Sequence, residues 1–475
     1  MEHFDLVVVG GGINGTAIAR DAAGRGARVL LVEKDDLASH TSSASSKLAH
    51  GGLRYLEQYE FRLVREALAE RETLLRNAPH IVRPLRFVLP VAQGMRPRWM
   101  LRLGLLLYDL LSLRGSLPRS RHVGRADPVR APLRDGAGRK LLSYWDSWVD
   151  DARLVALNAV DAAERGAEIA TRTEFLSAAR EDGLWRISLS GGREVTAASI
   201  VNAAGPWVGE VLGRRIGEES EARVRLVRGS HIVVPALWQG EQAYILQQPD
   251  GRVVFALPFE GATMIGTTDV VASGPGDAEA SAEEVAYLCA AANLYFASEI
   301  APADVIWSFA GVRALWDDGA ADPEDVTRDY RLEVEEGLLS VFGGKLTTAR
   351  ALAGEALDRL GVPGLKFTRT TPLPGGDIYP PFLAWLDEIG RWMPAGLLAR
   401  LSRAYGTRMR ELVGDARRVE DLGRHFGAGF YETELRYLID HEFARTAEDV
   451  LWRRTKLGLR FSPAEKAALE QWFEA

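Results

Sequence analysis

One stretch near the start of the chain, residues 5–33, constrains the fold most strongly, because it reads as strand, glycine turn, helix and second strand in that order. Residues 5–9 are rich in valine, as in a parallel strand that is buried on both faces. Glycines follow directly at the three positions of a G-x-G-x-x-G frame: Gly10, Gly12 and Gly15. Such a frame allows a tight turn, close approach of the backbone to a pyrophosphate, and close packing of helix on strand.

The helix and second strand of this stretch predict the ligand class. A helix at residues 14–25 would direct its free N–H groups and the positive end of its dipole at a pyrophosphate. The strand at residues 28–32 ends in Glu33, where a carboxylate accepts hydrogen bonds from ribose hydroxyls and repels a 2′-phosphate. The stretch therefore predicts a site for NAD or FAD rather than NADP. The alternative is an ordinary βαβ unit with a glycine-rich turn.

Length and composition limit the remaining possibilities. A chain of 475 residues is too long for one compact core, so we expect two or three domains. The net charge of −7 argues against a nucleic-acid binder. The single cysteine, Cys289, cannot form an internal disulfide, which suits a reducing cytoplasm. The first strand begins too early to leave room for a signal peptide. We therefore expect a cytoplasmic protein whose lipid contacts, if it has any, come from within the fold.

The segment after Glu33 has a composition suited to ligand contact. Residues 34–52 are rich in serine, glycine and other small residues, and they offer hydroxyls and amides to a phosphate-bearing ligand. The alternative is a flexible surface loop. Residues 53–76 then show apolar positions at helical spacing, and they predict one helix.

The most apolar run of the chain is RPRWMLRLGLLLYDLLSLR at residues 96–114. It has basic residues at both ends, and Trp99 and Tyr108 are aromatic residues of the type found at membrane interfaces. Arg102 and Asp109 interrupt it, and it is too short to predict a transmembrane helix. Two readings remain open. One is a helix buried between domains, and the other is a monotopic amphipathic anchor whose arginines meet anionic headgroups.

The later segments repeat the opening pattern and then depart from it. Residues 194–209 and 338–353 each read as a strand, a glycine turn and a helix. Residues 223–269 read as alternating strands with a hairpin at Asp250-Gly251, which predicts an antiparallel sheet inserted into a parallel fold. A Pro- and Gly-rich linker at residues 368–381 precedes a C-terminal region with helical periodicity.

Eight segments, taken together, resemble the FAD-dependent glycerol-3-phosphate dehydrogenases of the D-amino-acid-oxidase-like flavoprotein superfamily. They are VVVGGGINGTAIARDAAGRG, SSASSKLAHGGLRYLE, IVNAAGPWV, RGSHIVV, GTTD, FAGVRAL, TRDY and FGGKLTTAR. The resemblance implies non-covalently bound FAD, oxidation of sn-glycerol 3-phosphate to dihydroxyacetone phosphate, and a quinone as the usual acceptor at the membrane. It also implies peripheral attachment to an anionic membrane on the inner face of the cell membrane. A homodimer is compatible with it, and neither nucleic acid nor a metal ion is expected.

The resemblance and the segments together predict an α/β fold. We expect a Rossmann-like FAD-binding domain with an inserted antiparallel-sheet substrate domain and a helical C-terminal domain. The predicted FAD-binding domain is discontinuous and comprises residues 1–85, 146–215 and 305–367. The predicted substrate domain comprises residues 86–145 and 216–304, and the C-terminal domain residues 368–475.

The resemblance also assigns site residues, motif by motif. The residues expected to bind FAD are Gly10, Gly12, Asn14, Gly15, Glu33, Ser42, Ser45, Ser46, Lys47, Asn202, Ala203, Gly205, Gly344, Leu346 and Thr347. The residues expected to face the substrate are His50, Arg54, Tyr55, His231, Arg313, Arg328 and Lys345.

The substrate set is chemically reasonable for a phosphomonoester. A group with nearly two negative charges favours arginine forks and ammonium groups, and Arg54, Arg328 and Lys345 come from three distant segments. The reaction removes a proton from the C2 hydroxyl and a hydride from C2, which passes to N5 of the flavin. Arg313 is better suited to stabilising alkoxide charge than to acting as a base. His50 and His231 are the candidate bases, and we favour His231.

Three other functions remain open at this point. The first is an α-glycerophosphate oxidase, with the same pocket and molecular oxygen as the acceptor. The second is a flavoprotein that oxidises another hydroxy or amino acid, although a carboxylate needs fewer cationic partners than a phosphate does. The third is a dinucleotide-binding regulatory protein without turnover.

Overall fold

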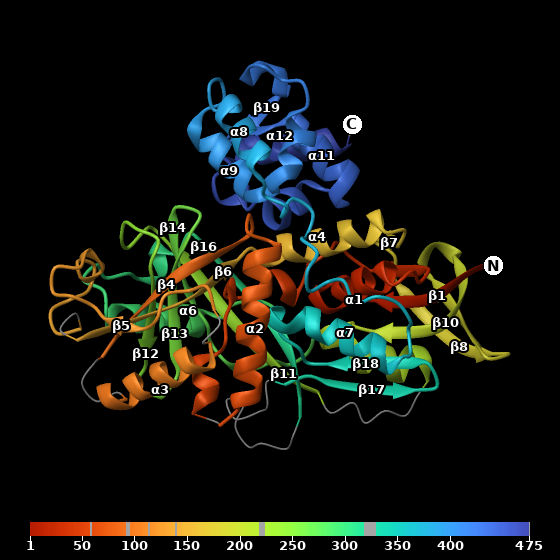
Figure 1. Ribbon diagram of the computed structural model, residues 1–475, viewed down its shortest axis with the longest axis horizontal. Coiled ribbons are helices and arrows are strands. Elements are labelled where there is room, and N and C mark those ends of the chain that lie inside the picture. Colours follow the sequence, from red (N-terminus) through yellow and green to blue (C-terminus); the bar gives the residue numbers. More distant parts are fainter. Residues whose placement is uncertain are drawn as a thin grey trace.

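A computed structural model describes residues 1–57, 59–91, 96–112, 115–137, 140–217, 224–317 and 329–474. Two sheets with their helices form the larger part of the molecule, and the C-terminal helices form a separate group that is drawn in blue at the top of Figure 1.

The first sheet is mostly parallel and contains the opening strand of the chain. Its strands lie in the order β17 (Arg331–Glu335), β18 (Leu338–Phe342), β10 (Glu194–Asn202), β1 (Glu2–Val9), β2 (Val29–Val32) and β7 (Glu168–Ala170). All but β17 run parallel to their neighbours in this order. The central strands are buried on both faces, as their valine-rich sequences predict.

Both faces of this sheet are covered. One face packs against α1 (Ile13–Gly24), α4 (Asp151–Glu164) and α7 (Ala349–Arg359). The other face packs against the hairpin of β8 (Phe175–Glu181) and β9 (Leu184–Leu189) and against the helical segment of α5 (Val208–Glu210) and η6 (Val211–Ile216). The sheet therefore presents the turns that follow β1, β10 and β18 at one edge, where parallel strands end together.

The second sheet is mostly antiparallel. Its strands lie in the order β15 (Val270–Val271), β11 (Val224–Val234), β14 (Ala262–Gly266), β13 (Val253–Phe259), β12 (Ala243–Gln247), β4 (Val82–Pro90), β6 (Leu141–Val149) and β3 (Leu48–Ala49). Two further strands extend it: β16 (Trp307–Trp316) pairs with β11, and β5 (Arg121–His122) pairs with β6. One face packs against α6 (Ala282–Asn293), and the other against α2 (Phe61–Asn77) and α3 (Arg98–Leu111).

The two sheets and the C-terminal helices confirm the predicted fold class. Strands β3, β4, β6 and β16 join the second sheet from segments that lie wholly or partly in the predicted FAD-binding domain. The exact domain boundaries stay a proposal. The predicted single helix at residues 53–76 is instead a 3₁₀ turn, η2 (Leu53–Leu56), followed by α2. Tyr59 between them has a φ of +60°, a left-handed backbone that no α-helix accommodates.

The C-terminal region has its own hydrophobic core. Its elements are α8 (Pro380–Ile389), α9 (Ala395–Tyr405), α10 (Met409–Val413), β19 (His425–Gly427), β20 (Phe430–Tyr431), α11 (Glu432–Glu442), the π-helical η11 (Asp449–Arg454) and α12 (Pro463–Glu474). In Figure 1 this group lies above α4 and the end of β16 and away from α3 at the lower left.

Candidate active site

A cavity of about 780 Å³ lies where the turns of the first sheet meet the second sheet. Its wall extends from Glu33 and Trp207, past the glycine turns and the serine-rich segment, to Lys345 and the helix α3. The predicted cofactor residues that line it are Gly10, Gly12, Asn14, Glu33, Ser42, Ser45, Ser46, Ala203, Gly205, Gly344, Leu346 and Thr347. The predicted substrate residues that line it are His50, Tyr55, Arg313 and Lys345.

The glycine turn after β1 fits a pyrophosphate because no side chain could be accommodated there. Gly10 has a φ of +111°, and a Cβ atom on it would lie 2.6 Å from the carbonyl oxygen of Ala203. A Cβ atom on Gly15 would overlap the carbonyl oxygen of Gly10. The turns after β1 and β10 therefore pack against each other through bare backbone. Together with the size of the cavity and the predicted ribose-binding acid Glu33, this close packing fits FAD.

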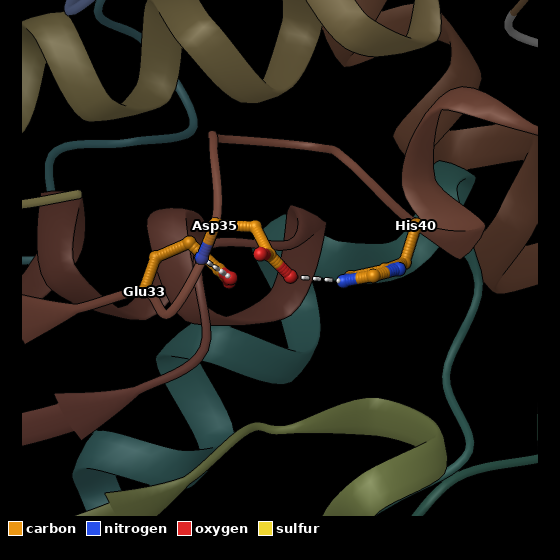
Figure 2. A group of neighbouring side chains, drawn as sticks. All are labelled: Glu33, Asp35 and His40. Atoms are coloured by element: carbon orange, nitrogen blue, oxygen red, sulfur yellow. Dashed lines mark hydrogen bonds and ion pairs between the residues drawn. The ribbon is translucent and has the colours of Figure 1, made fainter. Parts of the chain in front are cut away.

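Glu33 ends β2 at one end of the cavity, and backbone amides fix its carboxylate. Its Oε2 accepts from the N–H of Gly11 at 2.7 Å, and its Oε1 accepts from the N–H of Asp35 at 2.9 Å. Burial raises the pKa of Glu33, and these two N–H groups oppose the rise. Figure 2 shows Asp35 between Glu33 and His40, whose Nε2 lies 2.8 Å from Asp35 Oδ2.

These three side chains lie close enough together to hold a cation. However, both oxygens of Glu33 already accept backbone N–H groups, and Asp35 is engaged with His40. The ring of His40 lies 4.5 Å from the ring of Trp207, and the Nζ of Lys34 lies 4.0 Å from the same ring. Glu33 and His40 line the same end of the cavity as Trp207, whereas Asp35 does not line it.

The carboxylate of Asp151, which does not line the cavity, holds the serine-rich segment at residues 34–52 in place. The Oγ of Ser45 donates to Asp151 Oδ2 at 2.7 Å, and the Nζ of Lys47 donates to the same oxygen at 2.6 Å. Lys47 is buried, and its burial lowers the pKa of the ammonium, although Asp151 opposes this. The Lys47 side chain lies behind the cavity wall and does not line it. Ser42 lines the cavity and accepts from the N–H of Ile13 at 3.0 Å.

Asparagine side chains pin the other two turns. Asn202 donates to the carbonyl oxygen of Val208 at 3.0 Å, so it shapes the turn after β10 without lining the cavity. Asn14 donates to the carbonyl oxygen of Gly343 at 3.2 Å and thereby joins the start of α1 to the turn after β18. The Oδ1 of Asn14 is buried and has no hydrogen-bond partner among the described residues. A bound cofactor could donate to it.

The end of the cavity where the predicted substrate residues lie combines positively charged side chains with a histidine. Arg313 donates to Asp269 Oδ1 at 2.6 Å and to Thr267 Oγ1 at 3.2 Å, and these bonds fix the plane of the guanidinium. The Nζ of Lys345 lies 3.9 Å from the centre of the Tyr55 ring. Arg328 and the side chain of Arg54 lie outside the described residues.

The two candidate bases differ in position. His50 lines the cavity, and burial lowers its pKa, with Lys345 and Arg71 adding to the effect and Asp146 opposing it. His231 is fully buried and stacks on Phe309 at 4.8 Å, and burial lowers its pKa well below the ordinary value.

His231 does not line the cavity, and its Nε2 lies 2.9 Å from the Oγ of Ser46, which does. The geometry therefore favours His50 for direct contact with a substrate. His231 is better suited to orienting Ser46.

Other cavity residues were not singled out from the sequence. Thr267 and Asp269 belong to the GTTD segment, so a motif signal for them existed. Gln247 and Phe255 come from β12 and β13, where alternation predicts strands but gives no sign of function.

The helix α3 forms the outer wall of the cavity and also carries an exposed apolar face. Its lining residues are Met100, Leu101, Leu103, Gly104 and Leu107. Trp99 is 69% exposed, and Leu106 and Leu110 are 46% and 50% exposed, so α3 is not a helix buried between domains. Among the described residues, no helix has both the length and the apolar character needed to cross a bilayer.

The buried residue Tyr108 connects α3 to the substrate end. Its hydroxyl donates to Asp146 Oδ2 at 2.6 Å and accepts from the N–H of Gly51 at 2.9 Å.

The C-terminal domain reaches the cofactor end through buried charges. Arg453 and Arg454 both donate to the carboxylate of Asp36, which follows Glu33 by three residues. Lys456 donates to Asp150 Oδ1 at 2.7 Å, and the next residue is Asp151, the partner of Ser45 and Lys47. The short basic run at residues 453–456 therefore contacts the supports of two parts of the cavity wall.

Two family models cover most of the chain. A model described as FAD dependent oxidoreductase matches residues 5–358. A second, described as the C-terminal domain of alpha-glycerophosphate oxidase, matches residues 366–474.

Several curated proteins are similar over their full length. The D-erythritol 1-phosphate dehydrogenase of Brucella abortus is 50% identical over 493 residues, covering 100% of this chain and 98% of that protein. The glycerol-3-phosphate dehydrogenase of Pseudomonas aeruginosa is 50% identical, covering 100% and 96%. The aerobic glycerol-3-phosphate dehydrogenase of Escherichia coli is 46% identical, covering 99% and 97%.

Solved structures share the fold. The glycerol-3-phosphate dehydrogenase of Bacillus halodurans, complexed with FAD, superposes with a TM-score of 0.73 at 26% identity and covers 99% of this chain and 94% of that one. The L-alpha-glycerophosphate oxidase of Mycoplasma pneumoniae, with FAD bound, gives a TM-score of 0.60 at 19% identity and covers 76% of this chain and 95% of that one.

Proposed function

The chain belongs to the FAD-dependent oxidoreductase family, and we propose that it oxidises sn-glycerol 3-phosphate to dihydroxyacetone phosphate and passes the electrons to a quinone. FAD is its cofactor. The observation that carries the proposal is the convergence of Arg313, Lys345 and His50 on one cavity with the three glycine turns. A phosphate dianion needs such cationic partners, and an alcohol to be oxidised needs a base beside the cofactor.

The protein groups divide the work of binding and proton transfer. Bound FAD supplies the two-electron acceptor for the hydride that leaves C2. His50 takes the proton of the C2 hydroxyl, since its lowered pKa keeps the imidazole neutral at pH 7. Arg313, held in plane by Asp269 and Thr267, stabilises the negative charge that develops on that oxygen. Lys345 attracts the phosphate, and Arg54 and Arg328 remain the predicted additional phosphate ligands.

A peripheral membrane position on the inner face of the cell membrane is part of the proposal. The exposed apolar residues of α3 and its arginines Arg98 and Arg102 support binding to an anionic bilayer surface. The inner face of the same helix lines the cavity, so a lipid-dissolved quinone would arrive where the cofactor lies.

The absorbance spectrum of the purified holoenzyme tests the reaction. Anaerobic addition of sn-glycerol 3-phosphate is expected to bleach the oxidised flavin band, and a quinone analogue is expected to restore it. An unchanged spectrum with every polyol phosphate would favour a regulatory protein without turnover. Oxygen-electrode traces separate the dehydrogenase from an oxidase, because only an oxidase consumes oxygen rapidly without the quinone analogue.

D-Erythritol 1-phosphate is the second candidate substrate. The observation that favours it is the 50% identity to the D-erythritol 1-phosphate dehydrogenase over the whole chain, which equals the identity to the Pseudomonas aeruginosa enzyme. The two compounds share a phosphate and a secondary alcohol and differ in the number of hydroxylated carbons. The flavin reduction experiment is therefore run with both.

A further inference from the structure

Gln247 is a buried polar residue whose side chain has no hydrogen-bond partner in the part of the chain that the structure describes. It lies in β12, is 2% exposed, and lines the cavity. Neither its Oε1 nor its Nε2 makes a hydrogen bond to any described residue. Leaving a buried donor and a buried acceptor unsatisfied is costly, so such a group calls for a ligand or a functional reason.

The strand register places Gln247 near the substrate end of the cavity. In the β12–β13 pair, Gln247 lies opposite Val253, and Ile245 lies opposite Phe255. All four line the cavity, as expected for residues that alternate along one face of a sheet. The ring of Phe255 lies 6.3 Å from that of His50. Gln247 is two residues along β12 from the position opposite Phe255, which corresponds to about 7 Å.

The residues around the Gln247 side chain indicate which kind of ligand group it would hydrogen-bond. Its neighbours on this face, Ile245, Val253 and Phe255, are apolar, so the carboxamide is the polar group of this part of the wall. A carboxamide presents an acceptor oxygen beside an NH₂ donor group, and a hydroxyl group can donate to the oxygen and accept from the NH₂ group. A quinone carbonyl only accepts and would leave Oε1 unpaired. A phosphate favours the cationic end of the cavity.

We propose that Gln247 binds a hydroxyl of the polyol phosphate on the side of C2 away from the phosphate, and so determines which polyol phosphates are accepted. This inference rests on the proposed function and specifies its substrate class. With the phosphate at the cations and C2 at His50, the remaining hydroxylated carbon or carbons extend along the β12–β13 face. A site that hydrogen-bonds a hydroxyl discriminates strongly against an analogue that lacks it, because its own polar groups are then left unpaired.

The test compares substrates that differ only beyond C2. Propane-1,2-diol 1-phosphate keeps the phosphate and the secondary alcohol but lacks the terminal hydroxyl of sn-glycerol 3-phosphate. Anaerobic stopped-flow reduction of the holoenzyme by each compound gives a limiting rate and a dissociation constant. The efficiency with each compound is its limiting rate divided by its dissociation constant. We expect the efficiency of the wild-type protein to be about ten- to hundredfold or more higher with sn-glycerol 3-phosphate than with propane-1,2-diol 1-phosphate.

The variant Gln247→Leu is expected to lose this preference. It should reduce the efficiency with sn-glycerol 3-phosphate by about ten- to hundredfold and leave the efficiency with propane-1,2-diol 1-phosphate nearly unchanged. Its ratio of D-erythritol 1-phosphate to sn-glycerol 3-phosphate efficiency should change as well. Because an unpartnered amide is replaced by a hydrocarbon of similar shape, the thermal midpoint should not fall.

Gln248→Leu is the matched control. Gln248 is the adjacent residue, is 4% exposed, donates to the carbonyl oxygen of Leu246 at 3.3 Å, and does not line the cavity. Its substitution should leave the substrate ratio at the wild-type value. Gln247→Met serves as a second variant if the leucine variant does not retain flavin.

The experiment separates failure of the inference about Gln247 from failure of the proposed function. If no polyol phosphate reduces the wild-type flavin, both the function and the inference fail. If the wild-type enzyme is reduced and Gln247→Leu keeps the wild-type ratio, the inference alone is overturned. It is also overturned if the ratio is unchanged and only the KM for the quinone analogue rises, since the amide would then serve the acceptor.

Discussion

Arg454 and Asp36 form a buried, bidentate ion pair between the C-terminal domain and the loop that follows Glu33. The Nη1 and Nη2 atoms of Arg454 each lie 2.8 Å from a different oxygen of Asp36. The Nε of Arg453 donates to the same carboxylate at 2.6 Å. Because Asp36 is only three residues from Glu33, the predicted ribose-binding acid, the C-terminal domain supports the position of this loop.

Asp36→Asn is therefore expected to weaken both folding and FAD binding. Removing one charge of a buried pair leaves its partners uncompensated and costs about 3–5 kcal/mol. A loop that has lost its support holds Glu33 less well, so the dissociation constant for FAD should rise at least tenfold. Thermal midpoints with and without added FAD, together with a fluorescence titration of the apoprotein, measure the two effects.

Arg408→Gln is the control for this prediction. Arg408 pairs with Glu164 at 2.6 Å and so also joins the C-terminal domain to the first domain, but at the far end of α4. This pair is half-exposed, and its loss should cost less than about 1 kcal/mol. An unchanged FAD affinity in Asp36→Asn, beside a lowered midpoint, would reduce the ion pair to a structural contact.

His50→Gln is expected to slow flavin reduction by about 10²-fold or more, the usual contribution of a positioned base. His231→Gln should have a smaller effect, since His231 acts through Ser46. Stopped-flow reduction of both variants by sn-glycerol 3-phosphate makes the comparison. A wild-type rate in His50→Gln with a large loss in His231→Gln would restore the sequence-based preference for His231.

The pH dependence of this step has a definite sign. A base works when it is unprotonated, and burial lowers the pKa of His50. The midpoint of the decline in the limiting reduction rate should therefore lie below pH 6.5, the ordinary histidine value. A decline centred on or above the ordinary histidine pKa would exclude a neutral, buried His50 as the base.

The sequence predicted those parts of the fold that local chemistry determines. Valine-rich strands followed by glycine turns predicted the buried parallel sheet. The turns require glycine, because neither Gly10 nor Gly15 has room for a side chain. The same reasoning failed at Tyr59, a non-glycine residue with positive φ that separates the 3₁₀ turn η2 from α2 within the predicted single helix.

Contacts between residues far apart in the chain could not be predicted from the sequence. Asp36 and Arg454 are 418 positions apart, and no periodicity connects them. The position of a histidine relative to a cavity is also a property of the folded chain. His50 and His231 look equivalent as imidazoles in motifs, yet only His50 lines the cavity. Gln247 showed no sign of function because strand alternation describes which face a residue is on and not what that face contacts.

Binding of α3 to lipid is expected to depend on its outward apolar residues. Trp99, Leu106 and Leu110 are exposed and do not line the cavity. Replacing all three by serine should abolish flotation with anionic liposomes at low salt, since each buried apolar side chain contributes about 1.5–3 kcal/mol. Reduction of the flavin by sn-glycerol 3-phosphate should be unchanged. The paired substitution of Leu365 and Leu383, exposed leucines elsewhere, should leave flotation intact.

Recovery of the wild-type protein entirely in the unbound fraction would contradict the membrane part of the proposal. High salt should weaken flotation in the wild type, because screening reduces the attraction between arginines and anionic headgroups.

His80 is expected to make the fold sensitive to acid. It lies between the end of α2 and the linker glycine Gly375, and burial, with the nearby charge of Arg153, lowers its pKa to about 3. The unfolded chain protonates this histidine near pH 6.5. Between pH 6.5 and about 3 the unfolded state therefore binds the extra proton, and the free energy of unfolding falls as the pH falls.

One such group contributes a slope of up to about 1.4 kcal/mol per pH unit. His80→Gln removes that contribution, so its unfolding free energy should vary less steeply between pH 6.5 and 4 than that of the wild type, even if it is lower at pH 7. Urea titrations of both proteins at several pH values give the two slopes. Equal slopes would mean that the unfolded and folded chains protonate His80 alike, and that burial beside Arg153 does not govern its charge.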